Sequence, residues 1–394
     1  MKAFVFWNSM DKGEQMPLAK HRRAESQISA PIIGTDHADR SIRQVGAGMG
    51  RDTIAKVDDA ARNSPTVLHD KALRGAILLQ YPAQLTEILS SSLSKWLGAH
   101  AQVLDVAVNI RRYKPGRRCT FELELIPGLA EKDLKKHRRV IGKLYANNLG
   151  SKVYDTLQQL WSRGFSTGSL NVPEPLAYDP DWRLLLMSWA EGETLDELIL
   201  NQLDASRAVI QAAEWLVKLH KCGGSEGRHH NFNRLHKLSL WQRYLRVVHP
   251  EAESLFAEVR SRIEEQSGVL SGWTAAPTHC DYSPDHLVIN CDRITGVDFD
   301  EFGQYDPLFD VAHFMVHLRY LGLTHFGMLN QFDGLADLFQ STYKARVKDY
   351  SDARVRLYIV IVCLKMAHVI AFNRRSPNWK RLVDILLQEA RQTL

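Results

Sequence analysis

The sequence predicts an α+β protein of two lobes, a small N-terminal lobe built on an antiparallel sheet and a larger, mostly helical C-terminal lobe. Strand-like runs bounded by turn residues lie close together between residues 103 and 188. Beyond Gly192 the apolar residues recur instead at helical spacing. A chain of 394 residues, with 45% hydrophobic and 24% charged residues, is long enough for two such lobes with ordinary cores.

In the N-terminal half the expected elements alternate between helix and strand. Apolar spacing predicts helix over 68–98. VLDVAVNIRRY (103–113) and RCTFELEL (118–125) predict a hairpin, because the residues between them, Lys114-Pro115-Gly116-Arg117, have turn chemistry. Further elements are expected as a strand at 138–146, a helix at 151–161, and two short strands within 172–192 around Asp179-Pro180-Asp181.

The C-terminal half is expected to be helical, apart from a short hairpin within 286–303. Helices are predicted at 194–200, 206–224, 238–248, 251–265, 310–322 and 354–372. We therefore divide the chain into an extension of loose order at 1–66, an N-lobe at 67–189 and a C-lobe at 190–394. The glycine cluster Gly46 to Gly50 in the extension has neither the GxGxxG spacing nor a preceding strand, so we interpret it as a turn.

Composition narrows the classes of function. A net charge of +5 without a long run of Lys and Arg does not indicate a nucleic-acid partner. The five cysteines are scattered without a CxxC pair, which favours free thiols in a reducing compartment. The N-terminus has no secretory pattern, and no window approaches the roughly 18 apolar residues of a membrane span, so we expect a soluble, cytoplasmic protein without a membrane partner.

The residues with the clearest chemical meaning lie in HCDYSPDH, at 279–286. Transfer of a phosphoryl group from ATP requires a carboxylate to orient the acceptor hydroxyl, metal ligands that bridge the phosphates, and a cation on those phosphates. Asp281 is placed like that carboxylate. Asp298, in GVDFD, follows a predicted strand as a metal-binding aspartate does, and Lys143, in VIGKLYA, is placed like the strand lysine.

These pieces, in this order, resemble the aminoglycoside phosphotransferase and choline kinase-like family of phosphotransferases, which share the protein-kinase-like fold. The resemblance covers about residues 100–320 and includes RRYKPGRR (111–118), LMSWAEG (186–192) and VDFDEFGQYDPLFDVAHF (297–314). It implies ATP and Mg²⁺ as cofactors and a small-molecule hydroxyl acceptor. It also implies that Asp306 braces the catalytic loop and that Asp310 is a helix N-terminal acid.

The resemblance further assigns the candidate site residues. The catalytic pair would be Asp281, as base, and His279, which would support the loop by hydrogen bonding. The nucleotide would lie against Lys143, the hairpin residues Lys114, Gly116 and Arg117, and the hinge residues Ser188, Trp189 and Ala190. The metal residues would be Asp298, His286 and Asp300.

Two features depart from the family pattern. The predicted helix SKVYDTLQQLW has no glutamate to pair with Lys143, and Asp155 is its only acid. His286 stands where the family has asparagine, and an imidazole suits manganese or zinc better than magnesium. The site then uses one metal on Asp298, prefers a softer ion such as Mn²⁺, or has lost catalysis. Between residues 279 and 310 eight carboxylates accompany one arginine, and such crowding favours a cation site.

The acceptor is narrowed by the segment 228–250, which has four Arg, one Lys, four His and no carboxylate. That composition disfavours a polycationic acceptor, although a basic surface helix would give it too. We therefore expect an ATP-dependent kinase that phosphorylates a hydroxyl of a sugar-like or other metabolite. The alternatives are an aminoglycoside or choline-type kinase, and a catalytically idle nucleotide-binding module.

Overall fold

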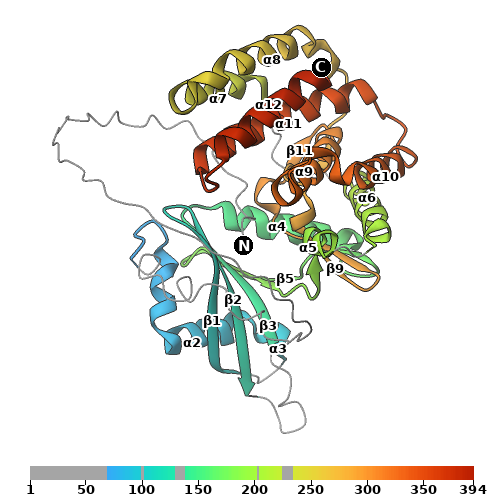
Figure 1. The fold of residues 1–394 in the computed structure, drawn as a ribbon. Helices are drawn as coiled ribbons and strands as arrows, with labels where there is room; N and C mark the ends of the chain where they lie inside the picture. The colour runs from blue at the N-terminus through green and yellow to red at the C-terminus, as the bar shows by residue number, and fades with distance from the viewer. Residues whose placement is uncertain (1–68, 99–101, 129–137, 202–203, 224–233) are drawn as a thin grey trace, which may run out of the picture.

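The computed structural model describes residues 69–98, 102–128, 138–201, 204–223 and 234–394. Within them, a sheet-bearing lobe precedes a larger helical one, as the sequence predicts (Figure 1). Two separate clusters of buried apolar residues form the cores, one in each lobe. The extension at 1–66 and its glycine cluster lie outside the described residues, so these two expectations stay predictions.

The N-lobe sheet is antiparallel, with the strand order β1-β2-β3-β6-β5. Its predicted hairpin is confirmed, and the turn places Gly116 at a φ of 67°, which glycine adopts without a Cβ clash. The strands are β1 (Gln102–Lys114), β2 (Arg118–Gly128), β3 (Arg138–Tyr145), β5 (Pro175–Asp179) and β6 (Leu184–Ser188).

One face of this sheet is covered by three short helical segments, where the sequence predicted a single helix over 68–98. The segments are η1 (Arg74–Gln80), α2 (Pro82–Ser92) and α3 (Ser94–Leu97). Pro82 starts α2 because a proline has no N–H to continue the preceding turn, and Gly98, at a φ of 106°, follows the end of α3. Leu85 and Leu89 of α2 belong to the same buried cluster as Phe121 of β2.

Helix α4 (Leu149–Leu160) lies between the sheet and the C-lobe (Figure 1). Its buried residues Val153 and Leu157 belong to the C-lobe cluster. A π-helical turn, η2 (Trp161–Phe165), follows it, and Gly164 there has a φ of 91°.

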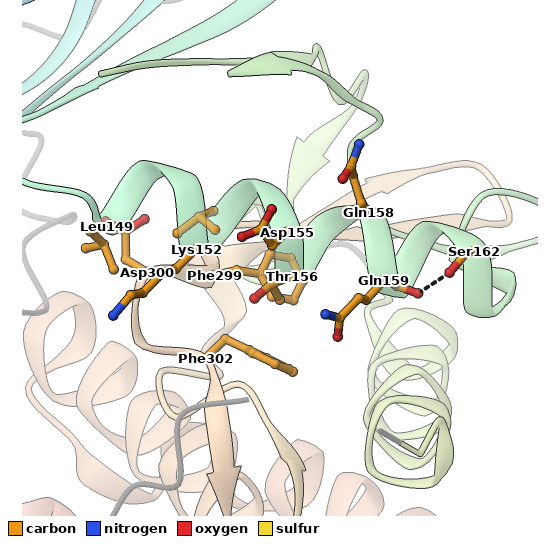
Figure 2. Close-up of a pocket in the computed structure, with 11 residues that line it drawn as sticks. Leu149, Lys152, Asp155, Thr156, Gln158, Gln159, Ser162, Phe299, Asp300 and Phe302 are labelled. Atoms are coloured by element: carbon orange, nitrogen blue, oxygen red, sulfur yellow. Dashed lines mark hydrogen bonds between the residues drawn. The ribbon is translucent and has the colours of Figure 1, made fainter. Parts of the chain in front are cut away.

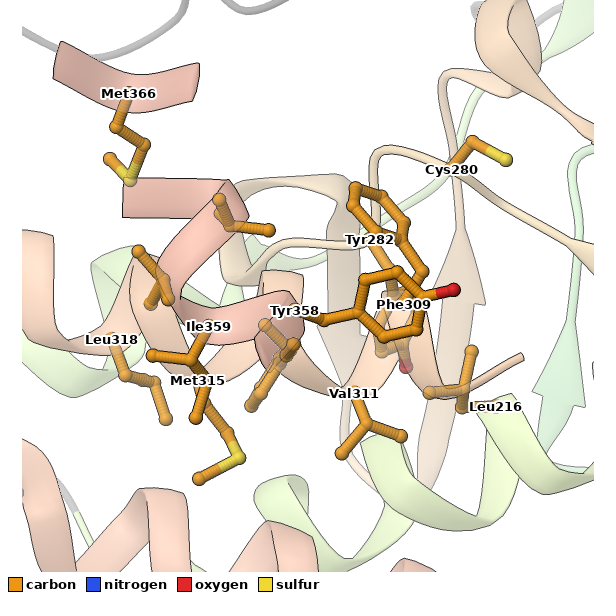
Figure 3. Close-up of a cluster of buried hydrophobic side chains, with 14 of the residues drawn as sticks. Leu216, Cys280, Tyr282, Phe309, Val311, Met315, Leu318, Tyr358, Ile359 and Met366 are labelled. Carbon is orange, nitrogen blue, oxygen red and sulfur yellow. The ribbon is translucent and has the colours of Figure 1, made fainter. Parts of the chain in front are cut away.

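The C-lobe is a bundle of helices around α9 and α11. Buried side chains of both helices belong to the same cluster as Cys280 and Tyr282 of the HCDYSPDH segment (Figure 3). Tyr282 from that segment is fully buried, and its ring lies 5.5 Å from that of Phe314 on α9. The helices are α5 (Leu195–Leu200), α6 (Ser206–Lys221), α7 (Arg234–Val248), α8 (Glu253–Glu265), α9 (Leu308–Phe326), α10 (Asp333–Lys344), α11 (Asp352–Asn373) and α12 (Trp379–Thr393).

The sequence did not predict α10 and α12, although their apolar residues have helical spacing. In α12 the buried residues Leu382, Val383, Leu386, Leu387 and Ala390 recur at intervals of three to four. Single-turn 3₁₀ segments join several of these helices, namely η3 (Pro250–Ala252), η4 (Ser267–Leu270) and η7 (Leu329–Phe332).

Helix α11 corrects the expectation that no apolar window reaches membrane length. Among the described residues it is the one helix long and apolar enough to span a bilayer, with a mean hydropathy of 2.0 in its best window. That window is 72% buried inside the fold, which is typical of a central core helix.

Short strands hold the chemical motifs in place. The strands β8 (Ala276–Thr278) and β11 (Gly303–Tyr305) pair with one another, so they tie together the two ends of the segment 279–302. Between them, β9 (Leu287–Asn290) and β10 (Arg293–Gly296) form the predicted hairpin, flanked by β4 (Leu170–Asn171) and β7 (Glu193–Thr194). Two 3₁₀ turns, η5 (Pro284–His286) and η6 (Phe299–Glu301), complete the segment.

Candidate active site

The loop that carries Asp281 is held by a carboxylate from α9. The backbone N–H groups of His279 and Cys280 donate to the two oxygens of Asp310, over 2.7 and 2.8 Å. Cys280 has a φ of 62°, which a residue with a side chain adopts only under constraint. Asp310 in turn accepts from His220 Nε2 at 3.2 Å, and the Tyr343 hydroxyl contacts His220 Nδ1 at 2.7 Å. A buried chain of polar groups therefore fixes this loop.

Asp310 lies in the first turn of α9, as the sequence predicts, but it also braces the loop, a part that the sequence assigned to Asp306. Asp306 caps α9 by accepting from the backbone of Leu308 at 3.1 Å, and it also contacts the Tyr358 hydroxyl at 3.0 Å and Arg354 at 3.2 Å. Asp310, one helical turn later, is the residue that braces the catalytic loop. The two acids lie four residues apart, so their spacing alone does not say which one faces the loop.

Asp281 is only 1% exposed and lies beside Lys365 and His313. Its Oδ1 is 3.7 Å from Lys365 Nζ and 3.5 Å from His313 Nε2, and it accepts no hydrogen bond from the described residues. Burial raises the pKa of Asp281 to about 7, against the opposing pull of Lys365 and His286. A carboxylate with an open acceptor position and a pKa near neutrality is suited to take a proton from a hydroxyl.

His286 faces Asp298, another of the candidate metal residues. Its Nδ1 donates to the carbonyl oxygen of Asp281 over 2.9 Å, so its Nε2 is turned toward the Oδ2 atoms of Asp298, at 3.7 Å, and of Asp285, at 3.8 Å. Burial works to lower the pKa of His286, but these carboxylates outweigh it and raise that pKa. The carboxylates around His286 therefore favour its protonated form beside Asp298.

Lys143 finds its acidic partners in the C-lobe. Its ammonium lies 2.8 Å from Asp298 Oδ1 and 3.2 Å from Asp300 Oδ1. Asp300 also accepts from the Tyr145 hydroxyl at 2.9 Å and pairs closely with Arg118. Asp300 thus occupies the place that the absent helix glutamate leaves open, whereas Asp155 is exposed on α4.

Asp298 is surrounded by N-lobe cations. Arg118 Nη1 lies 3.3 Å from Asp298 Oδ1, and Arg112 Nη1 lies 3.8 Å from Oδ2. Burial works to raise the pKa of Asp298, but Arg118 and Lys143 outweigh it and hold the pKa well below its usual range. Asp298 itself lies just after β10 and has a φ of 64°. The carboxylate is therefore ionised and firmly held.

The predicted cation site is thus occupied largely by the protein's own cations. Among the described residues no group of three or more His, Cys, Asp and Glu side chains is arranged to hold a metal ion. Mg²⁺ is commonly bound through one or two carboxylates plus the phosphates of a nucleotide, and Asp298 Oδ2 fits that limited part. His286 fits in its neutral form, because a metal ion binds the unprotonated ring nitrogen. Asp300 is engaged by Arg118, Lys143 and Tyr145, which favours a structural role for it.

The hairpin tip lies beside these cations. Gly116 N and the Tyr113 hydroxyl both donate to Asp70, over 2.7 and 2.9 Å, so an acid that precedes η1 holds the turn. Burial, together with Arg118 and Arg112, lowers the pKa of Lys114 to about 6. Arg117 is exposed at the tip, and its backbone N–H donates to the carbonyl of Lys114 at 3.1 Å. A bound anion would relieve the repulsion among Lys114, Arg112 and Arg118.

The hinge residues are half-buried where the chain leaves β6. The Ser188 backbone N–H donates to Glu174 O at 3.0 Å, and the Ser188 hydroxyl accepts from Glu174 N at 2.8 Å. The ring of Trp189 is covered by the guanidinium of Arg139, 3.8 Å from its centroid. The backbone of Trp189 and Ala190 is thus better placed than the N–H of Ser188 to meet a ligand.

His279 supports the site without facing it. The side chain is fully buried, its Nε2 donates to the carbonyl of Val297 over 3.0 Å, and burial lowers its pKa to about 4. A neutral His279 therefore links the catalytic loop to the residue before Asp298. This is a positioning contact of the kind that the sequence suggested.

Several residues of the site were not predicted as such. Lys365 was detectable, because it is the single charged residue between Leu357 and Asn373 in a strongly apolar helix. Arg112 stands in a hairpin where either face is possible, so its direction depends on the strand register. The other unpredicted residues are Tyr145, Asp285 and His313.

A cavity of about 730 Å³ lies to one side of this cluster, between α4 and the η6 segment (Figure 2). Lys152, Asp155 and Gln159 of α4 line it, together with Phe299 and Phe302. Of the site residues only Asp300 borders it, so it is separate from the space beside Asp281.

A fold whose two lobes bring a strand lysine, a buried loop aspartate and a strand-end aspartate together is that of a kinase-like phosphotransferase. The sequence model described as "Phosphotransferase enzyme family" matches residues 134–325. This segment therefore belongs to that family, and the chain is an enzyme of the phosphotransferase class. No protein in the set of curated sequences matches the chain.

Solved structures of similar fold include kinases of two kinds. A thermostable mutant of aminoglycoside phosphotransferase APH(4)-Ia, in a ternary complex with AMP-PNP and hygromycin B, is 14% identical, with a TM-score of 0.54 and coverage of 79% of this chain and 98% of that chain. Choline kinase LicA from Streptococcus pneumoniae is 12% identical, with a TM-score of 0.55 and coverage of 79% and 100%. Choline kinase from Cryptosporidium parvum Iowa II is 12% identical, with a TM-score of 0.54 and coverage of 79% and 94%. At these identities the similarity establishes the fold, which is the predicted one.

Proposed function

We propose that the protein is an ATP-dependent kinase that transfers the γ-phosphate to a hydroxyl of a sugar-like or other small metabolite. The observation that carries the proposal is the position of Asp281. Its Oδ1 is buried, accepts no hydrogen bond from the described residues, and belongs to a carboxyl whose pKa burial raises to about 7. The hydroxyl of a bound substrate would donate a hydrogen bond to this oxygen.

In the proposed reaction the acceptor oxygen attacks the γ-phosphorus of ATP. The bond from that phosphorus to the β,γ-bridging oxygen breaks, ADP leaves, and the hydroxyl proton passes to Asp281. Lys143 and Arg118 hold the phosphates, since both already bind an oxyanion, the carboxylate of Asp298. The hairpin residues Lys114, Gly116 and Arg117 would lie over the phosphates. The backbone of the Ser188–Ala190 hinge would hold the adenine.

Asp298, with His286 beside it, would hold the Mg²⁺ that accompanies the nucleotide. When bound, the ion would neutralise charge on the phosphates. His286 makes Mn²⁺ the ion to compare with it, because imidazole nitrogen suits that metal better. The cytoplasmic location and the small-molecule partner belong to the same proposal.

An aminoglycoside or choline-type kinase is the alternative, because the similar solved structures include both kinds. The basic segment 228–250 does not decide between them, since Arg243 and Arg246 on its described part are exposed. The catalytically idle alternative gains no support from the family match or from the site, in which Lys143, Asp281 and Asp298 lie together.

The test is ATP turnover by the full chain with Mg²⁺ or Mn²⁺ across sugars, amino alcohols and aminoglycosides. Asp281→Asn should reduce turnover at least ~100-fold, because the variant cannot take the proton. Asp292→Asn is the matched control, since Asp292 is an exposed acid of the same segment and pairs with the exposed Arg207. Nucleotide binding without turnover under every metal and acceptor would overturn the kinase proposal.

The metal role of His286 has its own test. If Nε2 contacts the ion, His286→Asn should shift the ratio of Mg²⁺-supported to Mn²⁺-supported turnover toward Mg²⁺. Unchanged metal dependence would remove His286 from the metal site and leave Asp298 alone in it.

A further inference from the structure

Lys365 brings a buried positive charge to the side of Asp281 away from the N-lobe cations. The residue lies on α11, is 9% exposed, and is the single Asp, Glu, Lys or Arg between Leu357 and Asn373. An ammonium in such an apolar helix is costly unless it meets a partner of opposite charge. Asp281 is such a partner, at 3.7 Å.

Lys365 contacts His313 on α9, and the protonation of His313 determines the hydrogen bond that the ammonium makes. His313 Nδ1 lies 3.0 Å from the carbonyl oxygen of Tyr282, which can only accept, so Nδ1 carries the proton. His313 Nε2 is then an acceptor, and Lys365 donates to it over 3.1 Å. His313 is therefore a neutral support, and Lys365 is the charged group beside Asp281.

The position of an acceptor relative to Lys365 follows from these distances. A hydroxyl that donates to Asp281 Oδ1 lies about 2.7 Å from that oxygen. Since Oδ1 is 3.7 Å from Lys365 Nζ, the reacting oxygen lies at most about 6.4 Å from the ammonium. A charged group on the adjacent carbon of the acceptor lies about 3 Å from the reacting oxygen, so it comes within about 6 Å of the ammonium when it points toward Lys365.

At that range the sign of the charge on the acceptor matters. Two like charges about 6 Å apart, at an effective dielectric constant of about 20, are disfavoured on the order of 100-fold, and opposite charges are favoured to a similar extent. Lys365 thus penalises an amine or a quaternary ammonium next to the acceptor hydroxyl, whereas it attracts an oxyanion there.

We propose that Lys365 is a specificity-determining residue, and that the enzyme phosphorylates a hydroxyl that has a carboxylate or a phosphate close to it. This inference rests on the proposed kinase function and names its acceptor class, an anionic hydroxylated metabolite such as a hydroxy acid or a sugar phosphate. The acceptor proposed for this chain thus differs from choline and hygromycin B, which are named for similar solved structures.

The experiment compares acceptors of one skeleton that differ in charge. The six-carbon probes are glucose, gluconate, glucose 6-phosphate and glucosamine, and the three-carbon probes are glycerol, glycerate, glycerol 3-phosphate and 3-amino-1,2-propanediol. Relative kcat/KM is measured for the full chain, for Lys365→Met and for Lys365→Arg. Gluconate and glycerate separate a preference for carboxylate from a preference for phosphate.

The wild-type chain should prefer an anionic probe over its neutral counterpart by at least ~10-fold. Lys365→Met should reduce that ratio by at least ~10-fold, and Lys365→Arg should keep most of it. A purely structural Lys365 would instead lower the rates with all probes alike, and this result would overturn the inference. So would a preference for the neutral or the amino probe.

Two further measurements keep folding and turnover apart from specificity. The Tm of Lys365→Met is compared with that of Lys380→Met, in which an exposed lysine of α12 is replaced. Binding of the same probes to the ATP-loaded wild-type chain and Lys365→Met is followed by saturation-transfer NMR. An anionic probe that binds in the wild type alone supports the inference even without turnover, in which case only the kinase proposal fails. Absence of binding by every anionic probe overturns it.

Discussion

Replacing Asp310 with Asn should loosen the loop that carries Asp281 while hardly changing the shape of the side chain. Asp310 accepts from the backbone of His279 at 2.7 Å and of Cys280 at 2.8 Å, and it is fully buried. Asparagine offers one oxygen and one NH₂ group in the same space, so one of the two backbone N–H groups would face a donor.

The size of the effect can be worked from these two bonds. A hydrogen bond to a charged group contributes about 1.5–3 kcal/mol, and a neutral one about 1 kcal/mol. The variant would turn one charged bond into a neutral one, lose the other, and leave a buried donor unsatisfied. We therefore expect a loss of about 3 kcal/mol in the free energy of unfolding. We also expect at least a ~10-fold lower kcat, because Cys280 would no longer be held at its positive φ.

Urea unfolding gives the first quantity, and ATP turnover well below the unfolding midpoint gives the second. Asp306→Asn is the matched comparison, since Asp306 is equally buried but caps α9 and does not touch the loop. It should also lower stability, yet change kcat by less than ~3-fold. If Asp310→Asn unfolded within about 0.5 kcal/mol of the wild type, or kept full activity, the bracing role would be wrong.

Three further variants or conditions test other parts of the structure. Gly192→Ala should cost more than about 2 kcal/mol in urea unfolding, because φ is 131° and a Cβ would lie 2.1 Å from Ile289 O, whereas Gly334→Ala, in open space on α10, should cost nothing. The turnover rate should rise with pH through about 7, as the carboxyl of Asp281 loses its proton, and a flat profile from pH 5.5 to 8.5 would contradict that role. Asp300→Asn should raise the KM for ATP about 10-fold by releasing Lys143; a change confined to the metal concentration for half-activation would make Asp300 a metal residue instead.

The parts of the fold that the sequence predicted are those in which one local signal decides the structure. The Pro-Gly turn between 113 and 118 fixes a hairpin, and the apolar spacing in 206–224 fixes a helix. Lys143, Asp281 and Asp298 were found because their order along the chain matches a known arrangement. The structure brings Lys143 and Asp298 to within 2.8 Å across 155 residues.

The predictions that were wrong concern how side chains are oriented in space. Asp306 precedes α9 and Asp310 lies in its first turn, and their spacing in the sequence does not show which of the two meets the backbone of Cys280. The partner of Lys143 was sought on the next helix, as the family pattern suggests, but it comes from the other lobe. Eight nearby carboxylates suggested a metal, whereas arginines and lysines distant in sequence supply much of the neutralising charge.

This charge balance leads to a last prediction, on proton uptake. Asp298 and Asp300 face Arg112, Arg118 and Lys143, and Lys114 lies nearby, so cations outnumber carboxylates on the N-lobe side of the site. The excess is visible in Lys114, whose pKa burial and the two arginines lower to about 6, so that it is mostly neutral at pH 7.5. Bound phosphates would reverse that repulsion and raise the pKa of Lys114 again.

Nucleotide binding at pH 7.5 should therefore take up close to one proton per site, as Lys114 becomes charged. Calorimetry in two buffers of different ionisation enthalpy measures that number directly. Lys114→Gln should abolish the uptake, while Lys152→Gln, at an exposed lysine of α4, should leave it unchanged. Binding without uptake in the wild type would mean that the phosphates do not approach Lys114, and the hairpin would then lie away from the nucleotide rather than over it.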